Sequence, residues 1–457
     1  MPQGKSVSGV LKTTGGEPEV LAPHFENDSG GWVLQRETVT NHGDSANQPI
    51  PMRSSETSTT LPRILLVGAS VRWAAQSSKK AGFSVIGMDL FGDADTRAAC
   101  DVFYRISAED VSELERLRQK IDTIAERYHA RQWIVGGLGP WSEESAMGAS
   151  GPNELSRLCD GLAISVPTTL TKLSAAEVPW GPAAEAGISK QSVSRRWLVK
   201  QHRSCGGLGV RFWDPSDIEG RHAIESGQAF LQMYVSGHRY GLVAIANGEA
   251  THLMGLTRSL RHRVGSRPFV YAGSIGPCWN PAVPRETMAE LSRRVAAEYS
   301  IRGLFNLDFV HDRCGQWWLL ELNARPSGSC EVIERSAWQS GRISLSKSLM
   351  GMHIAAVDRT PFEANELETF NPERVNSLHL KQIVYAQPQG HFQTPDDIES
   401  IGDIPEDQTF VEEGHPIATS ISTCTGNSGS IGKMIRANTT RIRGMVQPER
   451  ASERLDS

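Results

Sequence analysis

Hydrophobic and polar residues follow two different periodicities along the chain, and each marks a different kind of element. The apolar run RILLVGAS, which begins at residue 63, has the length of a buried strand. It is followed by a helical stretch, VRWAAQSSKKAG, that Gly82 ends, and then by a second apolar run, FSVIGMD. This order predicts a βαβ unit. A helix over about 109–129 and a strand at QWIVGG extend it to a small parallel sheet flanked by helices.

Beyond the Pro- and Gly-rich stretch EVPWGPAAEAG, the pattern changes to short strands mixed with turns. Strand-like segments are RRWLVKQ, AFLQMYVSG, RYGLVAIANGEATHLMGL, GLFNLDFVHD and WWLLELN. ANGE and DRCGQ have the composition of hairpin turns, and ETMAELSRRVAAEYS predicts a helix among the strands. This region is therefore predicted to be α+β.

The two ends of the chain differ from this folded centre. The first 60 residues are rich in Ser, Thr, Gly, Asn and Pro and show no sustained period, which predicts disorder. From about residue 372, short strands between Pro and Gly turns predict a small β-rich lobe. We predict a disordered segment over 1–60, an α/β domain over 61–165 and a central α+β domain over 166–357. A β-rich lobe over 358–447 and a tail over 448–457 follow.

Composition narrows the class of protein. The 47 basic and 52 acidic residues give a net charge of -5, which argues against a general affinity for nucleic acid or anionic membranes. The seven cysteines contain no CxxC pair, so reduced thiols are expected rather than disulfides or a zinc site. No apolar run of about 18 residues occurs, and the N-terminus lacks the apolar core of a secretory signal. We therefore expect a cytoplasmic protein that binds neither nucleic acid nor membranes.

One polar row interrupts the hydrophobic pattern in WWLLELNARPSGS, residues 317–329. Successive strand side chains point to opposite faces, so Glu321, Asn323 and Arg325 are expected to share one face. The preceding strand, GLFNLDFV, offers Asp308 on its polar face. If the turn between the strands closes an antiparallel hairpin, Asp308 lies beside Glu321.

Two adjacent carboxylates and an amide oxygen suit magnesium, which proteins bind through one or two carboxylates together with phosphate oxygens. The alternative is a solvated strand face with one arginine salt bridge.

A second constellation lies in WLVKQHRSCGGLGV. An apolar strand delivers Lys200, and the chain then turns through Gly206, Gly207 and Gly209. Without a Cβ, glycine lets backbone N–H groups come close to an anion, so a lysine followed by such a loop can hold phosphates. The order of residues excludes a Walker A loop and a GxGxxG turn. An ordinary hairpin loop is the alternative.

The order of these pieces resembles the ATP-grasp superfamily. The chain contains, in this order, a lysine strand, a Gly-rich loop, a strand LQMYVSG and a hairpin ending in E-x-N-x-R. The resemblance extends over about 61–440. The resemblance implies an ATP-grasp fold with an N-terminal Rossmann-like domain, a central ATP-binding domain and a C-terminal β-rich lobe. SVRWAAQSSKKAGFSVIGMDLFGDAD, GLTRSL, PFVYAGSIGP and NARPSGSCEVIERS are similar to a branch of predicted ATP-dependent carboligases. That branch is related to biotin carboxylase and found with tetrahydromethanopterin-linked one-carbon metabolism.

The resemblance also implies roles for individual residues. Lys200 would contact the α and β phosphates of ATP, and the loop at Gly206, Gly207 and Gly209 would cover the triphosphate. Magnesium, with manganese as the alternative metal, would bind to Asp308, Glu321 and Asn323. Residues that match the adenine-binding hinge are Gln232, Met233 and Val235.

The candidate catalytic residues are Lys200, Arg325 and Glu331. Arg325 matches an arginine that holds the acid substrate and its phosphorylated intermediate in the biotin carboxylase relatives. Glu331 either acts as a base toward the attacking group or pairs with Arg325.

Four further cations have open roles. Arg72 follows the first strand, where open α/β sheets bind ligands, so it could touch substrate or form a local salt bridge. Arg258 has the same two readings. Arg239 stands where many family members offer an acid to the ribose, which is a departure from the pattern. Lys172 is a candidate second phosphate lysine or a surface residue.

These expectations converge on an ATP- and magnesium-dependent ligase that joins a small carboxylate to an amine through an acyl phosphate, in the assembly of a one-carbon carrier cofactor. A carboxylase-like ligase acting on bicarbonate stays open, although the chain has no biotinylation-type AMKM segment. A non-catalytic ATP-binding regulatory scaffold is the third reading. A homodimer is also left open, since relatives commonly dimerise.

Overall fold

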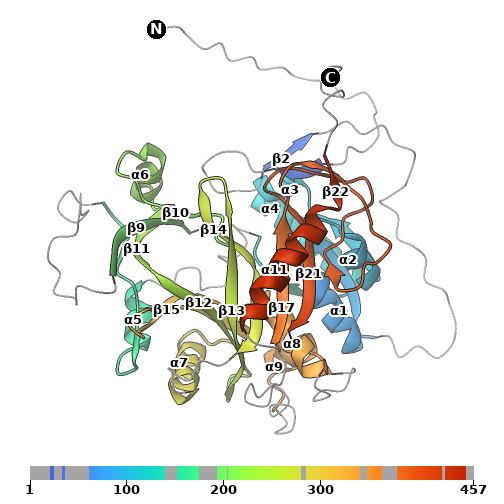
Figure 1. The fold of residues 1–457 in the computed structure, drawn as a ribbon. Coiled ribbons are helices and arrows are strands. Elements are labelled where there is room, and N and C mark those ends of the chain that lie inside the picture. Colours follow the sequence, from blue (N-terminus) through green and yellow to red (C-terminus); the bar gives the residue numbers. More distant parts are fainter. Residues whose placement is uncertain are drawn as a thin grey trace.

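The chain forms an N-terminal α/β domain, a small antiparallel sheet, a large central sheet and a C-terminal lobe (Figure 1). The structure is a computed structural model. It describes residues 21–24, 33–36, 61–138, 152–173, 193–202, 204–278, 285–339, 347–362, 378–424 and 428–448.

The N-terminal domain is a four-stranded parallel sheet in the order β5-β4-β3-β6, which confirms the predicted βαβ unit. Its strands are β3 (Arg63–Val67), β4 (Ser84–Asp89), β5 (Val102–Arg105) and β6 (Arg131–Ile134). Its helices are α1 (Arg72–Lys80), α2 (Ala94–Ala99), α3 (Ala108–Ser112) and α4 (Leu114–Tyr128). The helix predicted over 109–129 is thus two helices, because Glu113 leaves the helical conformation at φ -121° and ψ 86°.

The small antiparallel sheet has the order β10-β9-β11-β8. Its elements are β8 (Thr169–Leu170), β9 (Val193–Gln201), β10 (Val210–Phe212), α6 (Ile218–Glu225) and β11 (Ala229–Val235). Val199, Ile224 and Leu231 form its own core. Figure 1 shows this sheet, in green, standing opposite the long strands β13 and β14.

The central sheet contains nine strands in the order β19-β21-β17-β14-β13-β12-β15-β16-β7. The strands are β7 (Ile164–Ser165), β12 (Gly237–Ala246), β13 (Thr251–Val264), β14 (Arg267–Cys278), β15 (Gly303–Asp312), β16 (Trp317–Asn323), β17 (Leu378–Tyr385), β19 (Ile401–Gly402) and β21 (Pro416–Cys424). The associated helices are α5 (Pro152–Leu158), α7 (Arg285–Glu298), α8 (Ser329–Gln339) and α9 (Leu349–Val357).

Both faces of the central sheet are packed. Met288, Leu291 and Val295 of α7 bury one face, and Ile333 of α8 with Leu349 of α9 bury the other. The predicted hairpin turn between β12 and β13 is present. Within it, the Asn247 side-chain oxygen accepts hydrogen bonds from the Glu249 and Ala250 backbone N–H groups.

The predicted C-terminal lobe is partly continuous with the central sheet, since β17 pairs with β14 and β21 with β17. A separate three-stranded sheet contains β18 (Gly390–Phe392), β20 (Phe410–Val411) and β22 (Val446–Gln447). A helix that the sequence pattern did not predict, α11 (Ser428–Arg443), lies in front of β17 and β21 in Figure 1. Its Ile431, Met434 and Ile435 pack against Leu380.

Within the N-terminal segment, two short strands, β1 (Leu21–His24) and β2 (Val33–Arg36), form an antiparallel pair. The remainder of residues 1–60 lies outside the described residues, so disorder there stays a prediction. No helix in the described part of the chain is long and apolar enough to cross a membrane.

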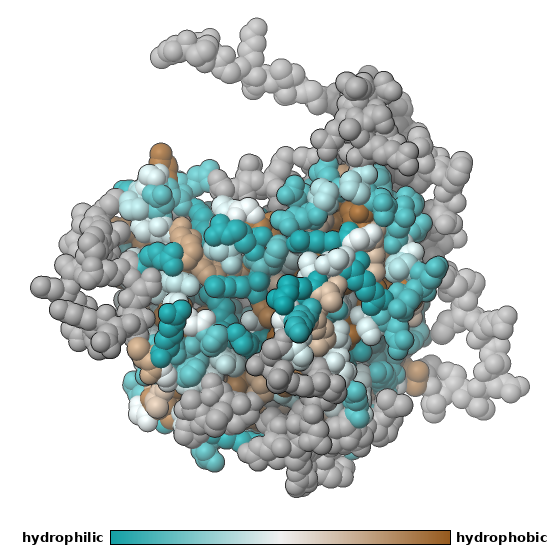
Figure 2. All heavy atoms as spheres, viewed as in Figure 1, coloured by the Kyte–Doolittle hydropathy of each residue, from teal (hydrophilic) through white to brown (hydrophobic). Residues whose placement is uncertain are grey.

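Hydrophilic residues cover most of the described surface on the face shown in Figure 2. Hydrophobic residues occur there only in small separate patches, and the large apolar side chains that are exposed lie far apart in sequence, at Leu61, Ile218 and Ile398. The described part of this face therefore shows no broad apolar surface.

His353 connects the N-terminal domain to the central sheet and should make folding sensitive to pH. Its Nδ1 accepts a hydrogen bond from the Leu304 backbone N–H at 2.8 Å, and its ring packs on Trp133. Burial lowers the pKa of His353 to about 4. The native state therefore stays unprotonated while the unfolded chain takes up a proton below about pH 6.5, so stability is lost as pH falls.

We expect the free energy of unfolding to fall more steeply for the natural protein than for His353→Gln. Between pH 7.5 and 5 the difference should be about 2 kcal/mol, since one unit of pKa shift corresponds to about 1.4 kcal/mol. Urea titrations of both proteins at the two pH values measure it. Parallel losses would show that His353 does not titrate on unfolding in this range.

Candidate functional site

The hairpin of β15 and β16 carries the polar row, as predicted. The strands are antiparallel, with Asp308 opposite Glu321 and Asn306 opposite Asn323. The alternate residues of β15 face the core beneath α7: Phe305, Leu307 and Phe309 are fully buried there. This alternation directs the carboxylates to the opposite face. A register shift directly after Asp308 marks a bulge, a feature that often re-aims side chains beside functional sites.

Hydrogen bonds hold the polar row in one arrangement. Asp308 accepts from Asn306 Nδ2 at 2.7 Å and from Asn323 Nδ2 at 3.0 Å. Strand β16 ends at Asn323, so Arg325 lies just beyond the strand, but its guanidinium still donates to Asn323 Oδ1 at 3.3 Å. The structure thus brings together four of the residues that the sequence singled out.

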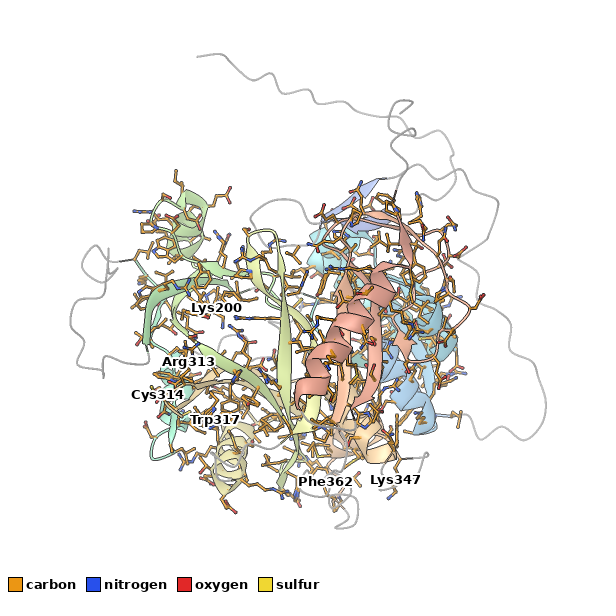
Figure 3. The ribbon with its side chains drawn as sticks, viewed as in Figure 1. Lys200, Arg313, Cys314, Trp317, Lys347 and Phe362 are labelled. Atoms are coloured by element: carbon orange, nitrogen blue, oxygen red, sulfur yellow. The ribbon has the colours of Figure 1, made fainter. Side chains whose placement is uncertain are left out.

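Lys200 reaches this row from the small antiparallel sheet. Its Nζ lies 3.3 Å from Glu321 Oε2 and 3.2 Å from Gln232 Oε1. Figure 3 labels Lys200 on the strand that faces the central sheet. Lys200 is only 9% exposed, whereas the Glu321 side chain is half exposed, so the ion pair joins a buried cation to the open side of the site.

The two carboxylates are held in different states. Burial, and then the negative charge of Glu321, raise the pKa of Asp308. Lys200 is the main cause of the opposite shift, which lowers the pKa of Glu321. One acid therefore favours its proton while the other is strongly ionised, and a cation between them would relieve the repulsion.

The residues present fit a magnesium ion completed by substrate oxygens. No group of three or more His, Cys, Asp and Glu side chains that could hold a metal occurs within the described residues. Two carboxylates and an amide oxygen from Asn323 match the small protein contribution that magnesium takes when phosphates supply its other ligands.

The Gly-rich loop lies against strand β14. Gly206 and Gly207 have φ values of 60° and 76°, which favour glycine. A Cβ on Gly207 would stand 2.1 Å from the Phe269 carbonyl oxygen, and the Gly206 carbonyl accepts from the Tyr271 N–H. At Gly209, a Cβ would meet the Ser204 side chain at 2.5 Å. Close backbone packing therefore requires glycine at 207, a side-chain contact disfavours a Cβ at 209, and the positive φ alone favours glycine at 206.

The loop also contacts the N-terminal domain. Cys205 Sγ donates to the Gly137 carbonyl at 3.4 Å, just beyond strand β6. A Cβ at Gly137 would lie 2.3 Å from the Cys205 Cβ and 3.5 Å from a nitrogen of the Arg325 guanidinium. The carboxyl end of the N-terminal parallel sheet, where such sheets bind ligands, thus borders Arg325 and the loop.

The predicted hinge residues have separate environments. Gln232 is buried beside Lys200, and Val235 packs with Val310 and Trp318 on the same face of the central sheet as Asp308. The register of β11 shifts between Met233 and Val235. A cavity of about 420 Å³ opens here, lined by Ser156, Cys159, Asp160, Ile164, Ser165, Val166, Thr168, Met233 and Trp318.

Glu331 does not pair with Arg325, so that alternative is wrong. Its buried carboxylate accepts from Arg72 at 2.9 and 2.8 Å, lies 2.8 Å from Lys381 Nζ and accepts from Arg335 at 3.2 Å. These cations outweigh the effect of burial and hold the pKa of Glu331 well below its usual value. A carboxylate held this way is a poor base, which favours a role in joining the domains.

Arg72 forms salt bridges, as in the second of its two readings, but its partners are distant in the sequence and not local. It is 1% exposed and bonds Glu331 and Asp403, with Asp95 3.6 Å away. Sequence reasoning missed Lys381 and Asp403, which come from the C-terminal lobe. The signal at Lys381 was a charged residue within the strand-like run HLKQIVYA, although no pattern identified its partner.

The structure also shows where the other cationic side chains with open roles lie. Arg258 is exposed and contacts His238 Nδ1 at 2.9 Å. Lys172 is exposed just beyond β8. Arg239 lies on β12 and faces the ring of Phe269.

Removing the Glu331 charge should destabilise the protein strongly. Glu331→Gln leaves Arg72 and Lys381 buried without their shared carboxylate, and a loss of about 3–5 kcal/mol is typical when one member of a buried pair is removed. Arg335→Gln is the matched control, since Arg335 is about one-third exposed and should cost less than about 1 kcal/mol. Chemical denaturation measures both. A Glu331→Gln protein as stable as the control would contradict the structural role.

Comparison with known proteins agrees with this geometry. The family model described as "ATP-grasp domain" matches residues 166–329. No curated protein matches the chain in sequence.

Solved structures resemble the whole fold at low identity. L-amino acid ligase from Bacillus licheniformis has a TM-score of 0.55 and 11% identity, covering 86% of this chain and 100% of that one. Biotin carboxylase from Campylobacter jejuni has a TM-score of 0.55 and 14% identity, covering 81% and 89%. N5-carboxyaminoimidazole synthetase from Staphylococcus aureus has a TM-score of 0.52 and 14% identity, covering 82% and 96%. The chain therefore contains an ATP-grasp domain and has the ATP-grasp fold, as the sequence predicted.

Proposed function

We propose that this protein is an ATP- and magnesium-dependent ligase that joins a small carboxylate to an amine through an acyl phosphate, with ADP and phosphate as products. The observation that carries the proposal is the convergence of Lys200, Asp308, Glu321, Asn323 and Arg325 between two sheets of an ATP-grasp fold. The similar solved structures include a ligase for amino acids.

The proposed phosphorylation brings two anions together, the carboxylate substrate and the triphosphate of ATP, so cations must surround them. A carboxylate accepts an amine poorly because its leaving group would be oxide, and phosphorylation by ATP replaces that group with phosphate. Lys200 is placed to neutralise charge on the transferring phosphoryl group as it develops. Asp308, Glu321 and Asn323 would hold magnesium, which when bound supplies further positive charge to the phosphate oxygens.

Arg325 is the residue that we assign to the acceptor acid. Its guanidinium projects from the end of β16 toward Gly137, at the ligand-binding edge of the N-terminal sheet. Guanidinium binds a carboxylate through two parallel hydrogen bonds and so fixes its orientation for attack on phosphate. Its bond to Asn323 ties this position to that of the metal.

The cavity beside Met233 is the proposed adenine site. Its lining combines the apolar side chains of Met233, Trp318, Ile164 and Val166 with the polar residues Ser156, Asp160, Ser165 and Thr168. A base could pack on the apolar part and form hydrogen bonds with the polar part. Gln232 would then couple the base to the phosphates, since it bonds Lys200. The Gly-rich loop would exclude water from the acyl phosphate, which otherwise hydrolyses.

The proposed cellular context is the assembly of a one-carbon carrier cofactor. It rests only on the sequence resemblance to the carboligase branch, so the assay must identify the substrates independently.

The test is release of ADP and phosphate from ATP and magnesium across a panel of amino acids, amines, bicarbonate and one-carbon cofactor precursors. We expect release that requires one acid and one amine together. Glu321→Gln should lower turnover by about a hundredfold or more, the scale of losing one electrostatic stabiliser of the transition state. Its melting temperature should change little because the Glu321 side chain is half exposed.

Other results would decide against this function. Release stimulated by bicarbonate alone would support a carboxylase-like ligase. ATP binding without release stimulated by any member of the panel would support a regulatory scaffold.

Substitution in the Gly-rich loop provides a second prediction. Gly207→Ala would place a methyl group against the Phe269 carbonyl, so the loop must move and ATP affinity should fall about tenfold or more. Gly206→Ala is the matched control, because φ is also positive there but a Cβ would meet nothing within 4 Å. ATP titrations of the two variants should differ clearly. Equal affinities would mean that contact of the loop with β14 does not position it for nucleotide.

A further inference from the structure

Arg239 occupies a position that the proposed chemistry has not used. It lies on β12 opposite Val310 of β15, and the next β15 residue on that face is Asp308, which stands opposite Gly241. The Arg239 side chain therefore shares a face of the central sheet with the candidate metal ligands. The cross-strand partner of Asp308 on β12, Gly241, has no side chain to cover the carboxylate from that strand.

The N–H donors of the Arg239 guanidinium have no acceptors among the described residues. Arg239 is partly buried, yet it makes no hydrogen bond or ion pair with any part of the chain that the structure describes. Its guanidinium carbon lies 4.8 Å from the centre of the Phe269 ring. A guanidinium carries five N–H donors, and leaving them unsatisfied away from water is costly, so a ligand with acceptor oxygens would be favoured there.

A second arginine shares the same aromatic ring. Arg261 of β13 lies 5.6 Å from the centre of Phe269, is exposed, and likewise has no hydrogen bond or ion pair among the described residues. Two cations on one ring repel each other. Burial and this neighbouring charge lower the pKa of Arg239, while Glu321 and Asp308 act in the opposite direction. A multivalent anion would neutralise both arginines at once.

Phe269 is a fixed platform for this pair. It is 4% exposed and packs against Phe212 and Tyr234 of the small antiparallel sheet, with ring centres 5.3 and 5.9 Å away. Its carbonyl is the atom that Gly207 approaches. The arginine pair therefore lies beside the Gly-rich loop, on the central sheet, while Lys200 comes from the opposite sheet.

We propose that Arg239 and Arg261 form a clamp for the polyphosphate of the bound nucleotide, with Phe269 as their common support. The inference rests on the nucleotide site of the proposed function. It assigns phosphate binding to a position where the family resemblance would place an acid for the ribose, and so reverses the charge that this strand offers. Lys200 and the clamp then hold the phosphate chain from opposite sheets.

The experiment is a binding series without acid or amine substrates, so no turnover is needed. Dissociation constants for adenosine, AMP, ADP and ATP are measured with magnesium by calorimetry for the natural protein, Arg239→Gln, Arg239→Lys and Arg261→Gln. We expect Arg239→Gln to leave adenosine binding unchanged and to weaken ATP by roughly 10- to 100-fold, the scale of lost charge-assisted hydrogen bonds. Arg261→Gln should also weaken ATP binding more than adenosine binding, but by a smaller factor, because Arg261 is more exposed than Arg239.

Arg263→Gln is the matched control. It removes one charge from the next exposed arginine of β13, and Arg263 has no place in the proposed site. It should leave the whole series unchanged, which separates local binding from the general effect of net charge. Arg239→Lys keeps the charge without the fork of donors, and recovery of part of the ATP affinity is expected.

Several results would overturn the clamp. An equal loss for adenosine and ATP in Arg239→Gln would indicate a structural or ribose role. If the natural protein binds no member of the series, the proposed function fails and the clamp with it. If the natural protein binds ADP and ATP, and Arg239→Gln and Arg261→Gln bind them with the same dissociation constants, the clamp is wrong while the proposed function stands.

Discussion

An ionised carboxylate without contact with water requires cations around it, and Glu331 obtains them from three parts of the chain. Arg72 belongs to the N-terminal domain, Arg335 to the same helix as Glu331, and Lys381 to a strand of the C-terminal lobe. No local segment could supply this set. The penalty for burying the charge is offset only when all three parts meet, so the interaction selects one relative arrangement of the domains.

That arrangement is what brings the two sides of the candidate site together. The helix that carries Glu331 follows Arg325 after only three intervening residues outside regular structure, so anchoring the helix also limits where Arg325 can lie. Across the site, the small antiparallel sheet contributes Lys200 and rests on the central sheet through Phe269 and the Gly-rich loop. Asp308 and Glu321 therefore meet on the central sheet, and Lys200 approaches them from the small antiparallel sheet.

The parts predictable from sequence were those governed by local periodicity. Alternation in FNLDF, a turn at DRCGQ and alternation in LELN predict a hairpin in which Asp308 lies beside Glu321, as the structure shows. The partners of Glu331 were not predictable in this way. Arg72 is 259 residues away, and no spacing rule relates residues that meet through the packing of separate domains. Helix α11 was missed because SGSIGKMIRANTTRIR contains two glycines and several weak helix formers, so packing on β17 decides its conformation.

The pairing of β14 with β17 has a consequence for how the chain can be divided. The predicted boundary between residues 357 and 358 separates β14 from β17, which are hydrogen-bonded neighbours in one sheet. Ending the chain there would leave β14 with a bare row of backbone donors and acceptors along Gly273–Gly276, beside side chains that had been covered. Such an edge is a template for pairing with a second molecule. The C-terminal lobe is therefore a cover for the central sheet as well as the source of Lys381, and the catalytic half would be expected to self-associate without it.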